Sequence, residues 1–194
     1  MNEGQKKQNG NADRIITIPN ILSFFRICLI PVIVWLYLVK KNYTGTAGVL
    51  ILSGATDMVD GFIARRFDMV SNVGKILDPI ADKLTQAVML LCLFTRFPMM
   101  VVPLSLMLVR EIFMGITGLL IIKKTGNVLG ACWHGKTATC LLYVMMILHV
   151  FWHDIPAMIS DFAIAACILM VAVSFALYGV RNIKILKQGS KGKQ

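Results

Sequence analysis

Six apolar segments alternate with short polar connections along the chain. A helix needs roughly 20 mostly apolar residues to cross a bilayer, and only a helix satisfies the backbone hydrogen bonds of one such segment there. The pattern therefore predicts an all-α, polytopic membrane protein with six transmembrane helices. The predicted spans are residues 21–39, 45–64, 75–95, 99–122, 137–151 and 157–180.

The two ends of the chain are polar. Residues 1–14 are rich in Gln, Asn, Lys and Gly, which predicts a flexible N-terminus. Residues 15–20, set off by Pro19, predict a short N-terminal interfacial helix. Residues 184–194 predict a basic cytoplasmic tail. Because no repeat, linker or change in composition divides the remainder, we expect one membrane domain over residues 15–183.

Composition supports a membrane protein over a soluble bundle, since 57% of the residues are hydrophobic and only 15% are charged. The net charge of +10 comes from Lys and Arg that flank the apolar segments, which indicates contact with lipid headgroups and no nucleic-acid partner. Only Lys40, Lys41 and Arg96 fall in the predicted outer connections. This asymmetry predicts that both termini lie in the cytoplasm. The five cysteines show neither the spacing of a disulfide framework nor that of metal ligands.

Two pairs of aspartates lie around the connection between the second and third predicted spans. Asp57 and Asp60 are three residues apart, and Asp78 and Asp82 are four apart, so each pair shares one face of a helix. The short connection makes the two helices antiparallel neighbours. Helix capping explains a carboxylate such as Asp78, but it does not explain four on converging faces. Clustered carboxylates favour divalent cations, and all-oxygen ligation suits Mg²⁺, Mn²⁺ or Ca²⁺.

The same residues form a longer pattern. Asp57, Asp60, Gly61, Ala64 and Arg65, then eight residues, then Gly74, Asp78 and Asp82 match D-x-x-D-G-x-x-A-R-x(8)-G-x-x-x-D-x-x-x-D at all eight fixed positions. This pattern resembles the signature of the CDP-alcohol phosphatidyltransferases. Most of the chain resembles the branch that contains phosphatidylglycerophosphate synthases and CMP-forming cardiolipin synthases. The resemblance includes the segment from Ile18 to Ser23 with Arg26, and Arg110-Glu111-Ile112.

The resemblance implies a six-helix fold, a homodimer, and transfer of a phosphatidyl group from CDP-diacylglycerol to an alcohol with release of CMP. It implies a two-metal site with Mg²⁺ or Mn²⁺, an active site at the cytoplasmic face, and the inner membrane of a bacterium. Asp82 matches the catalytic base, which also contacts a metal ion. The metal ligands are implied to be Asp57, Asp60, Asp78 and Asp82. The CDP-binding residues are implied to be Asp57, Asp60, Gly61, Ala64, Arg65, Gly74 and Asp78.

Three cationic residues are candidates for binding the acceptor: Arg26, Arg110 and Lys136. A cationic pocket favours glycerol 3-phosphate, which gives phosphatidylglycerophosphate. The alternatives are an ion pair between Arg110 and Glu111 and a topology-setting charge at Lys136. The chain has Gly135-Lys136-Thr-Ala138-Thr where phosphatidylglycerophosphate synthases often have a second lysine. This departure leaves a cardiolipin synthase with phosphatidylglycerol as acceptor, or another CDP-alcohol phosphotransferase, as alternatives.

Two other functional classes fit parts of the pattern. A divalent-cation transporter also has carboxylates within membrane helices, but its acidic residues lie near the middle of the bilayer on several helices. An aspartate-rich prenyltransferase needs two similar aspartate motifs, and this chain has one composite motif. The sequence therefore favours the phosphatidyltransferase over both.

Overall fold

The computed structural model describes residues 18–66, 74–125, 133–152 and 154–191. Every regular element in these ranges is a helix, as predicted. The chain forms two compact units, residues 1–92 and 93–194, and each is considered by itself. The predicted domain boundaries at residues 15 and 183 remain a prediction.

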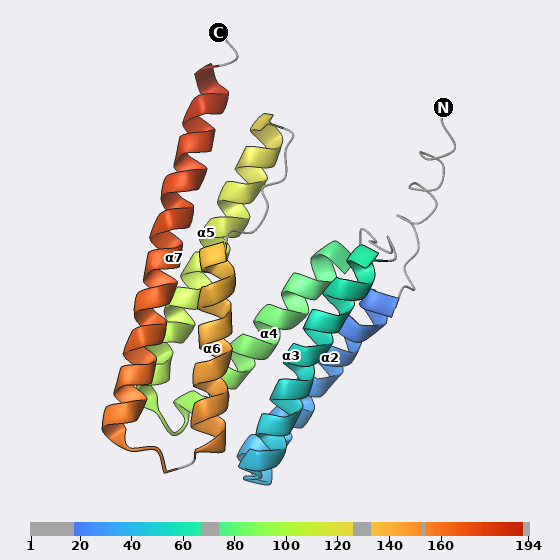
Figure 1. Cartoon of the computed structure of the whole chain (residues 1–194), viewed down its shortest axis with the longest axis vertical. Helices are drawn as coiled ribbons and strands as arrows, with labels where there is room; N and C mark the ends of the chain where they lie inside the picture. Colours follow the sequence, from blue (N-terminus) through green and yellow to red (C-terminus); the bar gives the residue numbers. More distant parts are fainter. Residues whose placement is uncertain (1–17, 67–73, 126–132, 153, 192–194) are drawn as a thin grey trace. The chain divides into compact units, whose positions relative to one another are not determined.

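The described part of the first unit is built from three α-helices. Helix α2 (Ile18–Val34) continues as a short π-helical turn (Trp35–Val39) and is followed by α3 (Tyr43–Arg66) and α4 (Gly74–Phe94). Lys41, with a φ of 50°, reverses the chain between the π-helical turn and α3. Helices α2 and α3 lie side by side (Figure 1). The apolar side chains of Leu29, Ile33 and Leu50 are buried in this unit.

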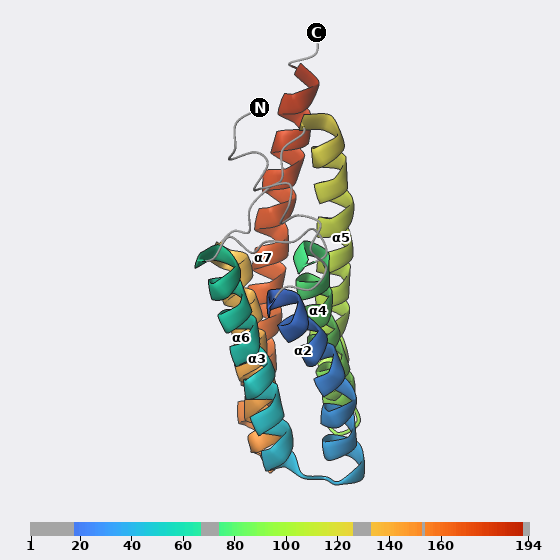
Figure 2. The same cartoon turned by 90° about the vertical axis from the view of Figure 1, so that its right-hand side faces the viewer.

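The second unit contains α5 (Val101–Thr125), α6 (Trp133–Phe151) and α7 (Ala157–Lys191), with a 3₁₀ turn (Pro98–Met100) before α5. Helix α7 packs along both α5 and α6 (Figures 1 and 2). Its buried residues include Ile164, Cys167 and Val171, which recur every three or four positions, as expected of one helix face.

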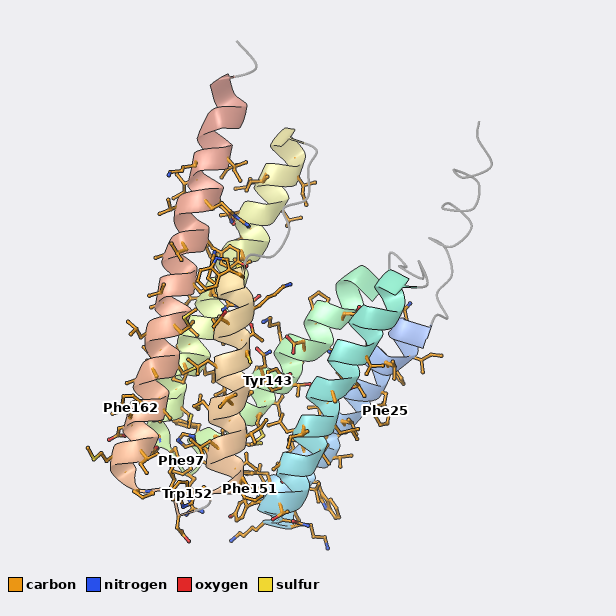
Figure 3. All side chains as sticks on the ribbon, in the orientation of Figure 1. Phe25, Phe97, Tyr143, Phe151, Trp152 and Phe162 are labelled. Carbon is orange, nitrogen blue, oxygen red and sulfur yellow. The ribbon has the colours of Figure 1, made fainter. Side chains whose placement is uncertain are left out.

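The end of the second unit near Phe97 and Trp152 is tied together by polar and aromatic contacts (Figure 3). The buried ring of His149 is hydrogen-bonded at both nitrogens: Nδ1 donates to the Met145 carbonyl oxygen 2.8 Å away, and Nε2 lies 2.9 Å from Ser160 Oγ. Phe97 packs edge-on against this ring, with centroids 5.0 Å apart. His149 therefore links α6 to the first turn of α7.

Helices cover nearly all of the six predicted spans, and within the described residues four of them are long and apolar enough to cross a membrane. These four are Asn20–Val39, Pro98–Lys123, Trp133–Phe151 and Ala157–Leu186. Helices α3 and α4 do not qualify within their described residues, and they are the two that carry the aspartates. Large apolar side chains, such as Phe25 and Phe162 in Figure 3, are exposed on both units, as in an integral membrane protein. That all six helices cross a membrane remains a prediction.

Parts of the two predicted ends lie within the described residues. The described part of the predicted interfacial stretch, residues 18–20, is the first turn of α2, and residues 15–17 lie outside the described residues. The predicted basic tail is helical through Lys191. The helix continues because Ile185 and Leu186 follow the buried Asn182 at helical spacing and extend its packed face.

Candidate active site

The aspartates occupy the predicted ends of α3 and α4. Asp57 and Asp60 lie in the second half of α3, and Asp78 and Asp82 lie in the first half of α4, which begins at Gly74. The side chains of Asp57 and Asp60 lie outside the described residues, as do those of Ala64 and Arg65. For these residues the structure gives only the helical backbone, which places each pair at the predicted spacing.

Helix α2 supplies the immediate partners of Asp78. Asn20, Ser23 and Arg26 recur every three residues and are all buried, so they form a polar face on an otherwise apolar helix. The Ser23 hydroxyl donates a hydrogen bond to Asp78 Oδ1. Arg26 Nη2 lies 4.0 Å from the same oxygen. An arginine with 1% of its side chain exposed is thus placed against a carboxylate in the first unit.

Asp82 has partners on its own helix. Gln86 Nε2 donates a hydrogen bond of 2.9 Å to Asp82 Oδ2, and Lys83 Nζ lies 3.7 Å from that oxygen. The Asp82 side chain is 15% exposed, and the Lys83 side chain is 26% exposed. The carboxylate is therefore partly exposed and is held by a buried amide donor on its own helix.

The second unit holds a separate polar cluster. His134 Nδ1 lies 3.3 Å from Ser174 Oγ, and the His134 ring meets the Tyr178 ring edge-on at 4.5 Å. The Arg181 guanidinium lies over the Tyr178 ring, 4.9 Å from the ring centroid. Arg110 and Arg181 both act electrostatically on His134. Helices α5, α6 and α7 thus bring two guanidinium groups and an imidazole into one neighbourhood, here called the cationic cluster: Arg110, His134, Tyr178 and Arg181.

Two predicted acceptor residues belong to this unit. Arg110 is buried and forms a 2.8 Å ion pair with Glu111, while its Nε has no hydrogen-bond partner within the described part of the chain. The predicted alternative for Arg110, an ion pair with Glu111, is thus present. Lys136 is exposed on the first turn of α6. The third predicted acceptor residue, Arg26, lies beside Asp78 in the first unit.

Sequence reasoning missed several of these residues. Ser23 and Gln86 were not singled out, although each contacts one of the predicted aspartates. Arg181 follows the last predicted span directly and has no predicted role in a site. One signal was available: Ser174, Tyr178 and Asn182 recur every four residues in an apolar helix, which marks a polar face.

The side chains of the aspartate motif are possible ligands of a divalent metal ion. Within the described side chains no three His, Cys, Asp or Glu residues form a group. The four motif aspartates offer only carboxylate oxygens, the ligand type that Mg²⁺ and Mn²⁺ prefer. Two of the four, Asp78 and Asp82, are partly exposed on one face of α4. The residues present therefore fit an all-oxygen metal site.

Comparison with known proteins finds relatives that are named as cardiolipin synthases and phosphatidyltransferases. It is 38% identical over 114 residues to a cardiolipin synthase (CMP-forming) / mitochondrial hydrolase fusion protein of Schizosaccharomyces pombe, covering 58% of this chain and 19% of that protein. It is 44% identical over 78 residues to a cardiolipin synthase (CMP-forming) of Streptomyces coelicolor, covering 37% of this chain and 36% of that protein. The chain thus spans less than two fifths of the length of these two relatives.

A longer match is found with a bacterial relative. The chain is 29% identical over 193 residues to the CDP-diacylglycerol–glycerol-3-phosphate 3-phosphatidyltransferase of Bacillus subtilis, covering 89% of this chain and 98% of that protein. The sequence model of the CDP-alcohol phosphatidyltransferase family matches residues 16–178, which include all eight motif positions and most of both structural units. The chain belongs to the CDP-alcohol phosphatidyltransferase family.

Proposed function

We propose that the protein transfers a phosphatidyl group from CDP-diacylglycerol to glycerol 3-phosphate, which yields phosphatidylglycerophosphate and CMP. The observation that carries this proposal is the placement of the complete aspartate motif on α3 and α4, with Asp82 partly exposed and held by Gln86. Family membership and the name of the Bacillus subtilis relative support the same reaction.

Asp82 is the proposed general base. Its carboxylate accepts the proton of the acceptor hydroxyl while the hydroxyl oxygen attacks the phosphorus that carries diacylglycerol. A new oxygen–phosphorus bond forms, and the bond between that phosphorus and the oxygen of CMP breaks. CMP departs with the electron pair on its phosphate oxygen. The reaction needs positioning and charge stabilisation more than covalent catalysis, which suits a site built from carboxylates on rigid helices.

Asp57, Asp60, Asp78 and Asp82 are the proposed holders of two Mg²⁺ or Mn²⁺ ions. When bound, such ions supply positive charge to the pyrophosphate and to the leaving CMP. Ser23 and Arg26 hold Asp78 Oδ1 from α2, so the orientation of this carboxylate depends on a second helix. Gly61, Ala64, Arg65 and Gly74 are proposed to shape the CDP pocket, since small residues leave backbone accessible to a flat ligand.

The acceptor is proposed to bear a phosphate that Arg26, Arg110 and Lys136 help to bind. The cationic cluster supports an anionic acceptor, because it brings the guanidinium groups of Arg110 and Arg181 into the neighbourhood of one imidazole ring. A planar guanidinium suits a phosphate well, since it can donate two parallel hydrogen bonds.

A cardiolipin synthase with phosphatidylglycerol as acceptor is the second candidate. It is favoured by Ala138, which stands where phosphatidylglycerophosphate synthases often have a second lysine, and by the names of the relatives from Schizosaccharomyces pombe and Streptomyces coelicolor. In either case we propose a bacterial inner-membrane protein that forms a homodimer, with its active site and both termini in the cytoplasm. The distribution of Lys and Arg along the sequence supports this orientation.

A panel of acceptors tests the choice between the two. Purified protein in detergent is given CDP-diacylglycerol, Mg²⁺ and one acceptor at a time: glycerol 3-phosphate, phosphatidylglycerol, inositol phosphate or serine. Mass spectrometry identifies the lipid product. We expect phosphatidylglycerophosphate with glycerol 3-phosphate alone. Cardiolipin formed from phosphatidylglycerol, with no product from glycerol 3-phosphate, would establish the second candidate instead.

A further inference from the structure

Gln86 is a fully buried amide one turn beyond Asp82 on α4. Its Nε2 donates the 2.9 Å hydrogen bond to Asp82 Oδ2, while its Oε1 is buried and has no hydrogen-bond partner among the residues that the structure describes. Glutamine is mostly an exposed residue, and buried polar atoms are nearly always paired. A buried glutamine that satisfies only one end of its amide therefore calls for an explanation.

Packing alone does not explain why a glutamine is buried at position 86. Burying an amide oxygen without a partner costs free energy, whereas methionine fills a similar volume without that cost. The neighbouring buried residues of α4, Met89 and Leu90, are apolar, so methionine suits this helix face. What glutamine adds over methionine is the hydrogen bond to the Asp82 carboxylate. A bond to a charged acceptor is among the stronger hydrogen bonds in proteins.

The hydrogen bond from Gln86 also restrains the orientation of the Asp82 carboxylate. Gln86 Nε2 and Lys83 Nζ both approach Oδ2 of Asp82, but at 2.9 Å and 3.7 Å only the amide is within hydrogen-bond distance. The lysine side chain is partly exposed and flexible, while the amide is held inside the helix packing. A buried donor on Oδ2 restrains rotation of the carboxylate, and it thereby sets the direction of Oδ1.

We propose that Gln86 is a positioning residue, which holds the Asp82 carboxylate in the orientation that accepts the proton from the acceptor hydroxyl. This inference rests on the proposed function of Asp82 as general base. A base must lie within about 2.6–3.2 Å of the atom whose proton it takes. A misplacement of about 1 Å can lower a rate by about a hundredfold, so a restraint on one carboxylate has a measurable effect on turnover.

The test compares Gln86→Met with Thr85→Val. Thr85 is equally buried on the same turn, and its hydroxyl is bonded to the Ala81 carbonyl oxygen 2.9 Å away, so its replacement removes a buried polar group that does not contact Asp82. Acceptor-dependent CMP release and thermal unfolding are measured for the full chain in detergent. For Gln86→Met we expect kcat to fall about tenfold or more, with the KM for CDP-diacylglycerol and the melting temperature little changed. For Thr85→Val we expect wild-type kcat.

The outcomes separate the two proposals. A wild-type protein without acceptor-dependent CMP release would remove the proposed function itself. An active wild type with a Gln86→Met kcat within twofold of it would overturn the positioning role alone. A fall in kcat that Thr85→Val shares equally would also overturn it, because loss of a buried polar group would then suffice. If Gln86→Met does not fold, Gln86→Leu, which is also apolar and has no donor, carries the same test, and wild-type kcat in that variant would overturn the role.

Discussion

Gly135 on α6 has no room for a side chain. A Cβ added there would clash with Tyr178 Oη and would lie 2.9 Å from Cε2 and 3.0 Å from Cζ of the same ring. Contacts between carbon atoms are ordinarily about 3.5–4.0 Å long, so the Tyr178 ring would have to move by about 1 Å. The ring is buried, lies edge-on to His134 and supports Arg181. Gly135→Ala should therefore disturb the cationic cluster as well as the packing of α6 against α7.

The expected change in the unfolding free energy of Gly135→Ala is the difference between two opposing contributions. Overpacking of a well-packed core costs about 1–3 kcal/mol. Alanine in a helix recovers up to about 1 kcal/mol relative to glycine. If alanine recovers the full ~1 kcal/mol, the net loss is about 0–2 kcal/mol, which corresponds to a fall in melting temperature of up to about 8 °C for a chain of this length. If the cluster binds the acceptor, the KM for the acceptor should also rise while the KM for CDP-diacylglycerol stays constant.

Gly115→Ala on α5 is the matched control, because nothing lies within 4 Å of a Cβ added there. It gains the helix-propensity contribution without the clash, so its melting temperature should stay level or rise. Thermal unfolding in one detergent and CMP release with varied acceptor compare both variants with the wild type. Equal melting temperatures for Gly135→Ala and Gly115→Ala, with equal acceptor KM values, would refute the close approach of Gly135 to Tyr178.

Three further predictions follow from other contacts. His149→Phe should lower the unfolding free energy by about 1–3 kcal/mol, because it leaves the buried Ser160 hydroxyl without its α6 partner; Ser160→Ala in the same background should restore part of the loss in a thermal-unfolding assay, and no restoration would contradict the bond. Chelation should abolish CMP release, and Mg²⁺ or Mn²⁺ should restore it; full activity in excess chelator would refute an all-oxygen metal site. Arg110→Met should raise the KM for the acceptor by about tenfold and spare that for CDP-diacylglycerol; equal changes in both, measured by steady-state kinetics, would contradict a role in acceptor binding.

Much of the fold could be predicted because membrane helices are local structures. The apolar runs 21–39 and 157–180 are visible in any window of sequence, and helices cover them. Helices α3 and α4 are less clear, since Asp57, Asp60, Asp78 and Asp82 reduce the apolar character of the segments that carry them. The motif locates the candidate site in the sequence, but its charged side chains make α3 and α4 the hardest helices to assign to a membrane.

The partners of the candidate site could not be predicted, because they depend on tertiary packing. Ser23 reaches Asp78 across 55 positions of sequence, and His134 meets Ser174 across 40. No local pattern specifies which helix faces meet. Gln86 is a different case: its spacing of four from Asp82 is visible in the sequence, but only burial distinguishes a restraining amide from an exposed one.

The most direct test of phosphatidyl transfer is the release of CMP from CDP-diacylglycerol by the purified wild type and by Asp82→Asn, each with and without glycerol 3-phosphate in the presence of Mg²⁺. The proposed function predicts that the wild type releases CMP only with the acceptor, in equal amount to the phosphatidylglycerophosphate formed. It predicts a loss of at least about a hundredfold in Asp82→Asn, which keeps the shape but cannot act as a base. CMP release that is independent of any acceptor, or that is unchanged in Asp82→Asn, would contradict it.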